Sequence, residues 1–329
     1  MNKKRFYITT QTPLRVSLFG GGTDIKNFFN HNVGCVVTTA INKFVYVTIK
    51  SHDKVFGENY RLNYSVTEST NNISKIRNKI IRACLKKFNI NFPIYISTIS
   101  DLPSNSGLGS SSSFTVGLLK ALYELKNLNV SQKKLAIEAS KIEIEVLKNP
   151  IGLQDQFIAS YGGFKFFRFK KNYNVISKTV KTTALKKILK KSVLLWTSMT
   201  HDASKLLKFQ NSKIKTNNKY LKQMSLIASK SEKLFNSNKL SERIFLDFLE
   251  ESWKIKKKLS SKVSNKTINN LYEKLKKNGA SGAKICGAGG GGFLFVYFKD
   301  NNFLKKIKKY HFYSINSWPK GCEVIYSKK

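Results

Sequence analysis

Three consecutive glycines near the start of the chain stand between two charged residues. Arg15 lies in the β-rich segment 12–19, and Asp24 follows the glycines 20–22 and Thr23. Because glycine carries no side chain, a ligand can approach the backbone closely at this turn, between a cation and a carboxylate. A tight hairpin without a ligand is the simpler interpretation of this segment taken alone. Two further segments rich in glycine and serine favour a ligand site.

The first of these segments, residues 101–113, has the composition of a phosphate-binding loop. Its sequence DLPSNSGLGSSSS lies between a predicted strand at 92–100 and a predicted helix that follows Ser113. In that position free backbone N–H groups and the positive end of the helix dipole converge on one point, where an anion would bind. Serine hydroxyls add donors, and a serine oxygen could bind Mg²⁺. The loop is not a Walker A motif, because no Gly-Lys-Ser/Thr sequence ends it, and a flexible serine-rich linker is the alternative.

The second segment, residues 279–292, comes directly before a predicted strand at 293–298. Residues 287–292 match the pattern G-x-G-x-x-G, but a dinucleotide-binding fold requires this loop to open a helix. We therefore expect a glycine-rich wall that packs closely over a ligand or over the other loops.

A carboxylate, Asp155, stands between these two loops, in a predicted loop after an acidic helix. That helix carries Glu138, Glu143 and Glu145. An Asp in a turn is most often a cap, and glutamates on a helix most often form a solvated face. In a chain with only 19 acidic residues, however, this clustering marks a candidate catalytic or metal-binding region.

Hydrophobic periodicity predicts a mixed α/β first half followed by a second domain. We expect strands over residues 5–19, 33–50, 92–100 and 164–169, and helices over residues 73–88, 114–125 and 131–147. Residues 170–191 are basic and lack a strong apolar period, so they form the candidate junction. Beyond them we expect a strand at 193–196, two long lysine-rich helices, a helix at 267–277 and the strand at 293–298. The predicted domains are residues 1–180 and 181–329.

The 329 residues include 59 Lys and Arg against 19 Asp and Glu, a formal net charge of +40. Such a charge is typical of proteins that bind nucleic acid or anionic membranes. The lysines are scattered among abundant Asn and Ile, as AT-rich codons would produce, so we do not expect nucleic acid to be the main partner. A basic surface would still attract phosphorylated metabolites, an effect that salt suppresses.

The cysteines and the N-terminal segment indicate the compartment. Four cysteines lie far apart, without a C-x-x-C pair or a His at ligand spacing, which predicts reduced thiols without a zinc site or disulfides. The N-terminus turns polar where a secretory signal would be apolar, and no uncharged apolar run is long enough to span a membrane. These features predict a cytoplasmic protein with no membrane partner.

Taken together and in this order, the three segments resemble the GHMP kinase superfamily, which includes galactokinase, homoserine kinase and mevalonate kinase. The most specific part is residues 102–113, similar to the family's nucleotide-phosphate loop, and residues 282–292 look like its C-terminal glycine motif. Within the superfamily, residues 12–24 and 154–156 are most similar to the D-glycero-D-manno-heptose 7-phosphate kinases. The resemblance covers nearly the whole chain. It implies an α+β fold of two domains, a ribosomal protein S5 domain 2-like N-terminal domain and a ferredoxin-like C-terminal domain, with ATP and sugar between them.

By this resemblance Asp155 matches the catalytic aspartate, and Arg15 matches the basic residue that pairs with it. Ser111 matches the serine that contacts Mg²⁺, and Glu143 matches the glutamate that completes the metal site, with Glu145 as a close alternative. The implied ATP-binding residues are Pro103, Ser106, Gly107, Leu108, Gly109, Ser110, Ser111, Ser112 and Ser113, beside a glycine-rich wall of Gly287, Gly289 and Gly290. The implied substrate-binding residues are Gly21, Gly22, Thr23, Asp24 and Gln154.

One departure from the galactokinases bears on the substrate. They carry Glu-His before the Thr-Asp pair, where this chain has Gly21 and Gly22, so the side chains that would grip galactose are missing. The resemblance therefore implies a sugar kinase that uses ATP and Mg²⁺ to phosphorylate the anomeric hydroxyl of D-glycero-D-manno-heptose 7-phosphate, for nucleotide-heptose and surface polysaccharide synthesis.

Three alternatives stay open beside this hypothesis. They are another sugar 1-kinase similar to L-fucose kinase, an inactive regulatory member of the superfamily, and a basic nucleic-acid-binding protein. A phosphorylated sugar needs a cationic clamp, for which Lys26, Lys43 and Arg61 are candidates that the sequence does not rank. The oligomeric state, including a homodimer, is also left open.

Overall fold

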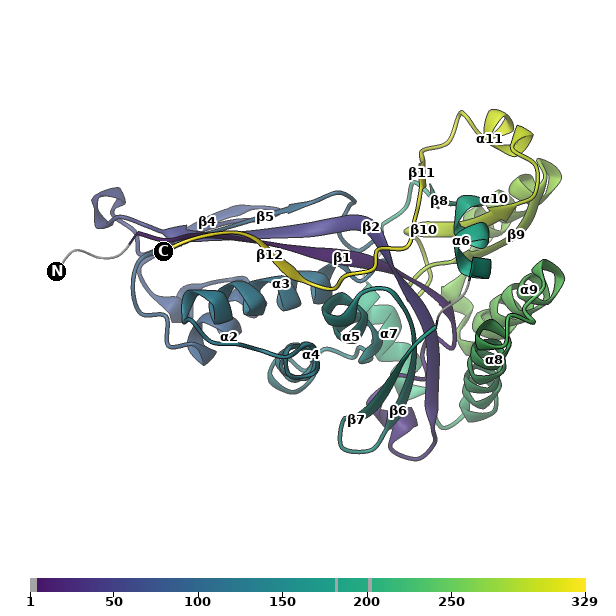
Figure 1. The fold of residues 1–329 in the computed structure, drawn as a ribbon, viewed down its shortest axis with the longest axis horizontal. Helices are drawn as coiled ribbons and strands as arrows, with labels where there is room; N and C mark the ends of the chain where they lie inside the picture. Colours follow the sequence, from purple (N-terminus) through teal and green to yellow (C-terminus); the bar gives the residue numbers. More distant parts are fainter. Residues whose placement is uncertain (1–4, 181–182, 201–202) are drawn as a thin grey trace.

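A computed structural model of the chain describes residues 5–180, 183–200 and 203–329. Within this part of the chain, two β-sheets form the two halves of an elongated molecule (Figure 1). The first sheet has the strand order β12-β1-β2-β5-β3-β4, and β6 and β7 extend it from β2. The second sheet has the order β11-β8-β10-β9. This α+β architecture with two sheets confirms the fold class expected from the sequence.

The strands of the first sheet are β1 (Tyr7–Phe19), β2 (Gly34–Ser51), β3 (Tyr60–Asn63), β4 (Thr67–Thr70), β5 (Ile94–Ser100), β6 (Phe164–Lys170), β7 (Asn174–Thr179) and β12 (Glu323–Lys328). Those of the second sheet are β8 (Ser192–Trp196), β9 (Ala280–Ile285), β10 (Phe293–Phe298) and β11 (Phe312–Ser314).

The helices are α1 (Lys26–Phe29), α2 (Lys79–Lys87), α3 (Ser110–Leu125), α4 (Gln132–Ser140), α5 (Gln154–Tyr161), α6 (Thr183–Lys190), α7 (Ala203–Ser212), α8 (Asn218–Asn236), α9 (Glu242–Leu259), α10 (Lys266–Lys277) and α11 (Asn302–Lys306). A π-helical turn, Lys141–Val146, continues α4. Among the helices described, none combines the length and the apolar character needed to cross a membrane.

Local signals explain two differences from the predicted helices. At the start of α2, Asn78 Oδ1 accepts a hydrogen bond from Ile81 N, so the predicted helix at 73–88 is shorter and begins after this cap. Residues Ile73–Lys75 form a 3-10 turn instead. The predicted helix at 131–147 starts after its Ser131 cap but changes to the π-helical turn after Ser140. Such π-turns inside helices are frequent at functional sites.

Helix α3 lies close against β1 because one of its residues has no side chain. A Cβ on Gly117 would lie 2.8 Å from Thr12 Oγ1. At the N-terminus of α3, Ser113 Oγ donates to Pro13 O at 2.9 Å. These contacts fix the loop that precedes α3 relative to β1, the strand that carries Arg15.

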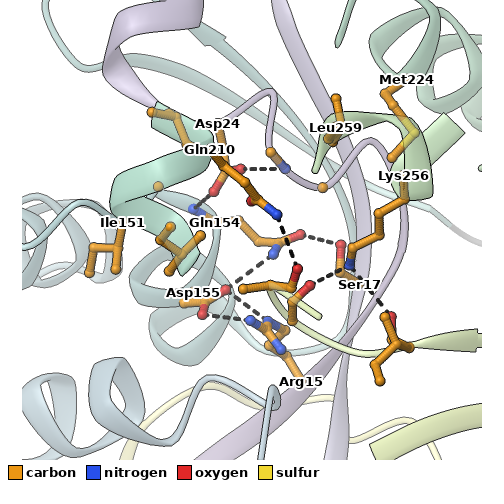
Figure 2. Close-up of a pocket in the computed structure, with 18 of the residues that line it drawn as sticks. Arg15, Ser17, Asp24, Ile151, Gln154, Asp155, Gln210, Met224, Lys256 and Leu259 are labelled. Carbon is orange, nitrogen blue, oxygen red and sulfur yellow. Dashed lines mark hydrogen bonds and ion pairs between the residues drawn. The ribbon is translucent and has the colours of Figure 1, made fainter. Parts of the chain in front are cut away.

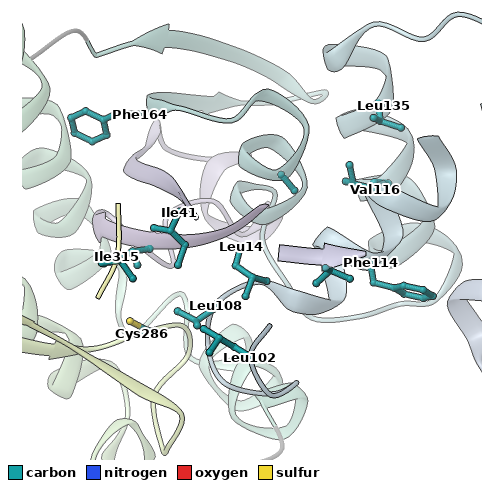
Figure 3. Packing of buried hydrophobic residues seen from close by; sticks show 14 of the residues in the cluster. Leu14, Ile41, Leu102, Leu108, Phe114, Val116, Leu135, Phe164, Cys286 and Ile315 are labelled. Atoms are coloured by element: carbon teal, nitrogen blue, oxygen red, sulfur yellow. The ribbon is translucent and has the colours of Figure 1, made fainter. Parts of the chain in front are cut away.

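Both halves of the molecule share one buried hydrophobic cluster. This cluster includes Leu14 of β1, Leu108 of the loop before α3, Phe114 of α3, and Cys286, which follows β9 (Figure 3). Leu194 of β8 is part of the same cluster. Since burial of apolar surface stabilises a protein by roughly 25 cal/mol per Å², the two halves are held together by the same force that folds each of them.

The predicted domain boundary at residue 181 lies outside the described residues. The basic stretch at 170–191, predicted as a junction, contains β7 and α6, and α6 buries Leu185, Ile188 and Leu189. The last strand, β12, returns to the first sheet and pairs antiparallel with β1. The predicted second domain, residues 181–329, does not anticipate this return.

Candidate active site

The predicted phosphate loop joins β5 to the N-terminus of α3. Gly107 and Gly109 both have a φ of 81°, which L side chains rarely adopt, and Gly109 is the N-cap of α3. The first helical backbone bond runs from Ser113 N to Gly109 O at 2.9 Å. The N–H groups before it have no helical acceptor, so they are available to an anion.

The serines of this loop are not equivalent. Ser111 is exposed, whereas Ser112 and Ser113 are buried. Ser112 Oγ accepts from Gln156 Nε2 at 3.0 Å, and the Ser113 hydroxyl is bound to β1. The Ser106 hydroxyl is buried without a partner in the described part of the chain. The Ser111 side chain is therefore open to a ligand, while Ser112 and Ser113 hold the loop in place.

The other residues predicted in this loop also differ in how exposed they are. Pro103 is exposed and Ser110 is half-buried. Leu108 is buried in the core and contributes its backbone, since its carbonyl accepts from Arg15 N at 3.0 Å.

The glycine-rich loop between β9 and β10 packs against the phosphate loop. A Cβ on Gly287 would lie 2.5 Å from Gly107 Cα. Gly289 and Gly290 lie instead against Val263, whose carbonyl accepts from Gly290 N at 2.8 Å. Glycine is required where two backbones touch, so the expected wall of glycines packs over other loops.

Arg15 and Asp155 form a bidentate ion pair beside the phosphate loop (Figure 2). Arg15 Nε donates to Asp155 Oδ1 at 2.7 Å, and Nη2 donates to Oδ2 at 2.6 Å. Arg15 Nη1 also donates to Gly107 O. Asp155 lies in the first turn of α5. The sequence predicted a loop at this position, and that prediction is wrong. Strand β1, helix α5 and the phosphate loop therefore meet at one carboxylate.

A second set of polar side chains orients Asp155 from β1. Ser17 Oγ donates to Gln154 Oε1 at 2.7 Å, and Gln154 Nε2 donates to Asp155 Oδ1 at 3.1 Å. Sequence reasoning assigned no role to Ser17. The available signal was its spacing, because residues two apart on a strand share a face and Arg15 is two residues earlier.

Asp24 closes the glycine turn against the start of α5. Its Oδ1 accepts from Gly22 N at 3.1 Å, and its Oδ2 accepts from Gln154 N at 3.0 Å. Burial raises the pKa of Asp24 above its ordinary value, although these backbone hydrogen bonds act in the opposite direction. A Cβ on Gly152 would overlap the Asp24 carboxylate, so glycine is required there.

Thr23, the remaining predicted substrate residue, is fully buried. Its hydroxyl donates to Gly20 O at 2.8 Å and accepts from Cys35 N at 3.0 Å. Thr23 therefore braces the turn from behind, whereas Gly21 and Gly22 line the pocket.

One pocket between the two halves collects most of these residues (Figure 2). β1, the glycine turn and α5 contribute Arg15, Ser17, Gly21, Gly22, Asp24, Gln154 and Asp155, and later segments of the chain contribute Leu207, Gln210, Met224, Lys256, Lys284 and Gly287. The predicted catalytic pair and the predicted substrate residues other than Thr23 thus share one pocket beside the phosphate loop.

Two buried lysines in this pocket were missed by sequence reasoning. Lys256 of α9 donates to Gly287 O, and Lys284 of β9 donates to Leu18 O at 2.6 Å. Burial, assisted by the positive charges of Lys284 and Arg15, lowers the pKa of Lys256 to about 7. Burial likewise lowers the pKa of Lys284 to about 8. The place of Lys284 inside the glycine cluster was a signal, but nothing distinguishes Lys256 from the other lysines of α9.

Glu143 lies on the π-helical turn and reaches the phosphate loop. Its Oε1 accepts from Ser111 Oγ at 2.9 Å, and its Oε2 accepts from Gln156 Nε2 at 2.7 Å. Glu143 is fully buried, and this burial raises its pKa above the ordinary value. The alternative, Glu145, accepts instead from Tyr173 OH at 2.8 Å.

The Ser111 hydroxyl and the Glu143 carboxylate fit Mg²⁺, which prefers oxygen ligands and is usually completed by waters and substrate phosphates. Beside them, Gln156 Oε1 is buried with no partner among the residues described. No three His, Cys, Asp or Glu side chains of the described ranges gather into a metal site. Phosphate oxygens would therefore have to complete the coordination.

The predicted phosphate clamps lie elsewhere. Lys43 stacks over an aromatic ring, and Lys26 and Arg61 each lie beside a glutamate. None of the three lines the pocket that holds Arg15 and Asp155.

Known proteins are similar to this chain in both sequence and fold. Residues 75–163 match the GHMP kinases N terminal domain, and residues 239–311 match the GHMP kinases C terminal family. A D-glycero-alpha-D-manno-heptose 7-phosphate kinase of Campylobacter jejuni is 34% identical over 326 residues, which cover 92% of this chain and 93% of that protein.

Two solved structures have the same fold. A D-glycero-D-manno-heptose 1-phosphate kinase from Bacteroides thetaiotaomicron superposes with a TM-score of 0.76 and 21% identity, covering 98% of this chain and 99% of the other. A Lactococcus lactis galactokinase complexed with galactose gives a TM-score of 0.71 and 17% identity, covering 98% and 95%. Both family matches, the full-length relative and the shared fold lead to one conclusion: the chain belongs to the GHMP kinases, which are ATP-dependent phosphotransferases.

Proposed function

We propose that this kinase transfers the γ-phosphoryl group of ATP to the anomeric hydroxyl of D-glycero-D-manno-heptose 7-phosphate and forms the 1,7-bisphosphate. The observation that carries the proposal is the Arg15–Asp155 pair, which lines the pocket with Gly21 and Gly22 and is bound to the phosphate loop. The similarity of nearly the whole chain to the Campylobacter jejuni enzyme supports this acceptor.

Asp155 is placed to take the proton of the acceptor hydroxyl. A carboxylate oxygen accepts about two hydrogen bonds. Oδ1 already accepts from Arg15 and Gln154, whereas Oδ2 accepts from Arg15 alone. A Cβ on Gly109 would lie 3.2 Å from Oδ2, so the glycine leaves room between this oxygen and the phosphate loop. In this proposal Oδ2 is the oxygen that takes the proton.

Phosphoryl transfer needs in-line positioning and charge neutralisation more than covalent chemistry. The acceptor oxygen forms a bond to the γ-phosphorus while the bond to the β-phosphate oxygen breaks and ADP leaves. Asp155 takes the proton, and Arg15 holds the carboxylate in position and stabilises the negative charge that develops nearby.

The phosphate loop supplies the rest of the positioning. The free N–H groups at the start of α3 would bind phosphate oxygens of ATP, and Ser111 and Glu143 would hold Mg²⁺. When bound, Mg²⁺ neutralises phosphate charge and orients the phosphoryl group.

A substrate panel tests this proposal. Purified protein is assayed for ADP release with heptose 7-phosphate, unphosphorylated heptose, L-fucose, galactose and mannose. We expect kcat/KM for heptose 7-phosphate to exceed that for each neutral sugar by at least roughly tenfold, a difference of about 1.4 kcal/mol. Turnover of a neutral sugar with none on any phosphorylated heptose would overturn the proposed acceptor.

A further inference from the structure

Three basic and two acidic side chains line the pocket: Arg15, Lys256 and Lys284, with Asp24 and Asp155. Asp155 forms an ion pair with Arg15. Asp24 accepts from the backbone N–H groups of Gly22 and Gln154. Within the described residues, the two lysine ammonium groups donate only to backbone carbonyls. The charge of both lysines is therefore left without a carboxylate partner.

Both lysines are buried, with 9% of Lys256 and 4% of Lys284 exposed. A buried cation without a counter-charge costs free energy unless hydrogen bonds or an anion compensate. Arg15 and Lys284 each disfavour the charged form of Lys256, because their positive charges lower its pKa. An anion bound in this pocket would reverse that effect.

The two ammonium groups differ in what they leave free. An ammonium has three N–H donors. Lys284 uses two of them on β1, on Ser17 O at 3.1 Å and Leu18 O at 2.6 Å. Lys256 bonds to Gly287 O, and its contact to Ile285 O is long, at 3.5 Å. Lys256 therefore retains donor capacity for a ligand, whereas Lys284 holds the end of β1.

The position of Lys256 connects the acceptor pocket to the phosphate loop. Figure 2 shows its side chain extending toward Ser17, on the side of the pocket opposite Ile151. Its partner Gly287 touches Gly107 of the phosphate loop. A ligand oxygen at this ammonium would belong to one of two groups, a phosphate on the acceptor or the phosphoryl group in transfer.

On the basis of the proposed kinase function, we propose that Lys256 binds a phosphoryl oxygen of the substrates in this pocket, with Lys284 as a positioning residue that holds the end of β1. The oxygen belongs either to the phosphate ester of the acceptor or to the group in transfer. The two sources predict different kinetics.

The test compares Lys256→Gln with Lys257→Met, a loss of charge at an exposed position one residue along α9, where the ammonium lies over the Trp253 ring. Lys256→Gln removes the charge but keeps N–H donors for the Gly287 carbonyl. Each variant is assayed with heptose 7-phosphate and with unphosphorylated heptose, and its melting temperature is measured. Lys257→Met is expected to leave KM and kcat for both acceptors within roughly twofold, as for surface substitutions generally.

If Lys256 binds the acceptor's phosphate ester, Lys256→Gln raises KM for heptose 7-phosphate by roughly 10- to 100-fold, the loss of a charged hydrogen bond. KM for the unphosphorylated heptose then stays unchanged. If Lys256 binds the group in transfer, kcat falls on both acceptors by a similar factor while KM stays unchanged. Losses below about threefold in kcat/KM on both acceptors, or a loss that only follows a lower melting temperature, would overturn the proposal.

Failure of the proposed function gives a different result. In that case the wild-type enzyme does not turn over heptose 7-phosphate at all. Lys256→Gln is then assayed on the acceptor that the panel identifies, and a kcat/KM within about threefold of wild type would still overturn the role of Lys256.

Discussion

At the scale of single residues, the site depends on two carboxylates, and each of their oxygens accepts at least one hydrogen bond. Asp155 is held by Arg15 and Gln154, and Gln154 is held in turn by Ser17. Glu143 is held by Ser111 and by an amide of α5. Such networks fix side-chain positions, and loss of one member leaves a buried polar group unpaired.

The two glutamates of the π-helical turn allow a matched comparison. We expect Glu143→Gln to raise the Mg²⁺ concentration at half-maximal rate by roughly 10- to 100-fold, the usual loss when a group around a metal site is removed. Glu145→Gln should leave it unchanged, because Glu145 bonds to Tyr173 away from the loop. Mg²⁺ titrations of kcat at saturating ATP decide between them. Equal effects of both variants would contradict the assignment of Glu143.

Lys256 predicts a pH dependence of acceptor binding. Its pKa of about 7 means that free enzyme loses this charge as pH rises through neutrality. The groups that act on this pKa in the described structure are Lys284, Cys286 and Arg15, and Asp24 and Asp155 line the same pocket. A phosphate ester is already a dianion above pH 7, since its second pKa is about 6. KM for heptose 7-phosphate should therefore rise between pH 7 and 9, by up to about tenfold per unit.

The measurement is KM against pH for the wild type and for Lys256→Gln. The variant should show a smaller rise of KM over this range than the wild type, because Lys256 no longer titrates and only Lys284, whose pKa is about 8, still does. A wild-type KM that is constant or that falls as the pH rises would contradict the role of Lys256 in binding the acceptor phosphate.

Some residues of the candidate site could be predicted from the sequence, and others could not. Arg15, Asp155 and Ser111 were predicted because each lies in a segment with a recognisable pattern, and the structure brings all three beside one loop. Their catalytic roles stay predictions. Lys256 could not be distinguished from the rest of the 59 Lys and Arg residues of the sequence. Its role is inferred from the burial of its side chain, which results from tertiary packing such as that of α9 against β9.

At the scale of elements, two glycine loops from the two halves touch through their backbones. A Cβ on Gly107 would lie 2.7 Å from Cys286 O. The sequence predicted two glycine-rich loops, and it predicted that the second would pack closely over a ligand or over other loops. It did not predict which loop the second one would cover. Loop-to-loop contacts depend on the shared core between the halves, for which the sequence has no periodic signal.

This contact predicts the effect of Gly107→Ala against a control with the same backbone conformation. Gly57 has the same φ of 81° as Gly107, but nothing lies within 4 Å of a Cβ placed on it. Gly57→Ala should cost only the strain of roughly 1–2 kcal/mol. Gly107→Ala adds a clash, so it should lower the melting temperature further and raise KM for ATP. Thermal unfolding and ATP titrations measure both, and equal effects of the two substitutions would count against loop contact.

At the scale of the whole molecule, a late segment of the chain returns to the first sheet. Strand β12 is the edge strand of this sheet and pairs with residues 7–11 of β1, the strand that carries Arg15 and Ser17 further along. Hydrophobic periodicity predicted a mixed α/β first half, because alternating strands and amphipathic helices leave local patterns, whereas the two-domain α+β fold was implied by the resemblance to the GHMP kinases. The sequence did not predict the return of β12, since strand pairing between distant segments leaves no local trace. Despite its net charge of +40, the chain belongs to a family of ATP-dependent phosphotransferases.

Removal of β12 should therefore lower the stability of the first sheet. We expect deletion of residues 323–329 to lower the melting temperature by at least about 4 °C, on the order of 2 kcal/mol, because residues 7–11 of β1 then keep only β2 as a partner. Deletion of Lys329 alone leaves β12 intact and removes one surface ion pair, with Glu124, so its effect should be small. Thermal unfolding of both truncations tests this, and equal melting temperatures would show that β12 does not support β1.

The central claim is that Asp155 accepts the proton of an anomeric hydroxyl during transfer from ATP. It is tested most directly by ³¹P NMR of heptose 7-phosphate incubated with ATP and Mg²⁺, with wild type and with Asp155→Asn. We predict that wild type forms a second phosphate ester at the anomeric carbon, and that Asp155→Asn loses roughly 100- to 10,000-fold in rate while it still binds ATP. A phosphate on another hydroxyl, or a variant rate within about tenfold of wild type, would contradict the claim.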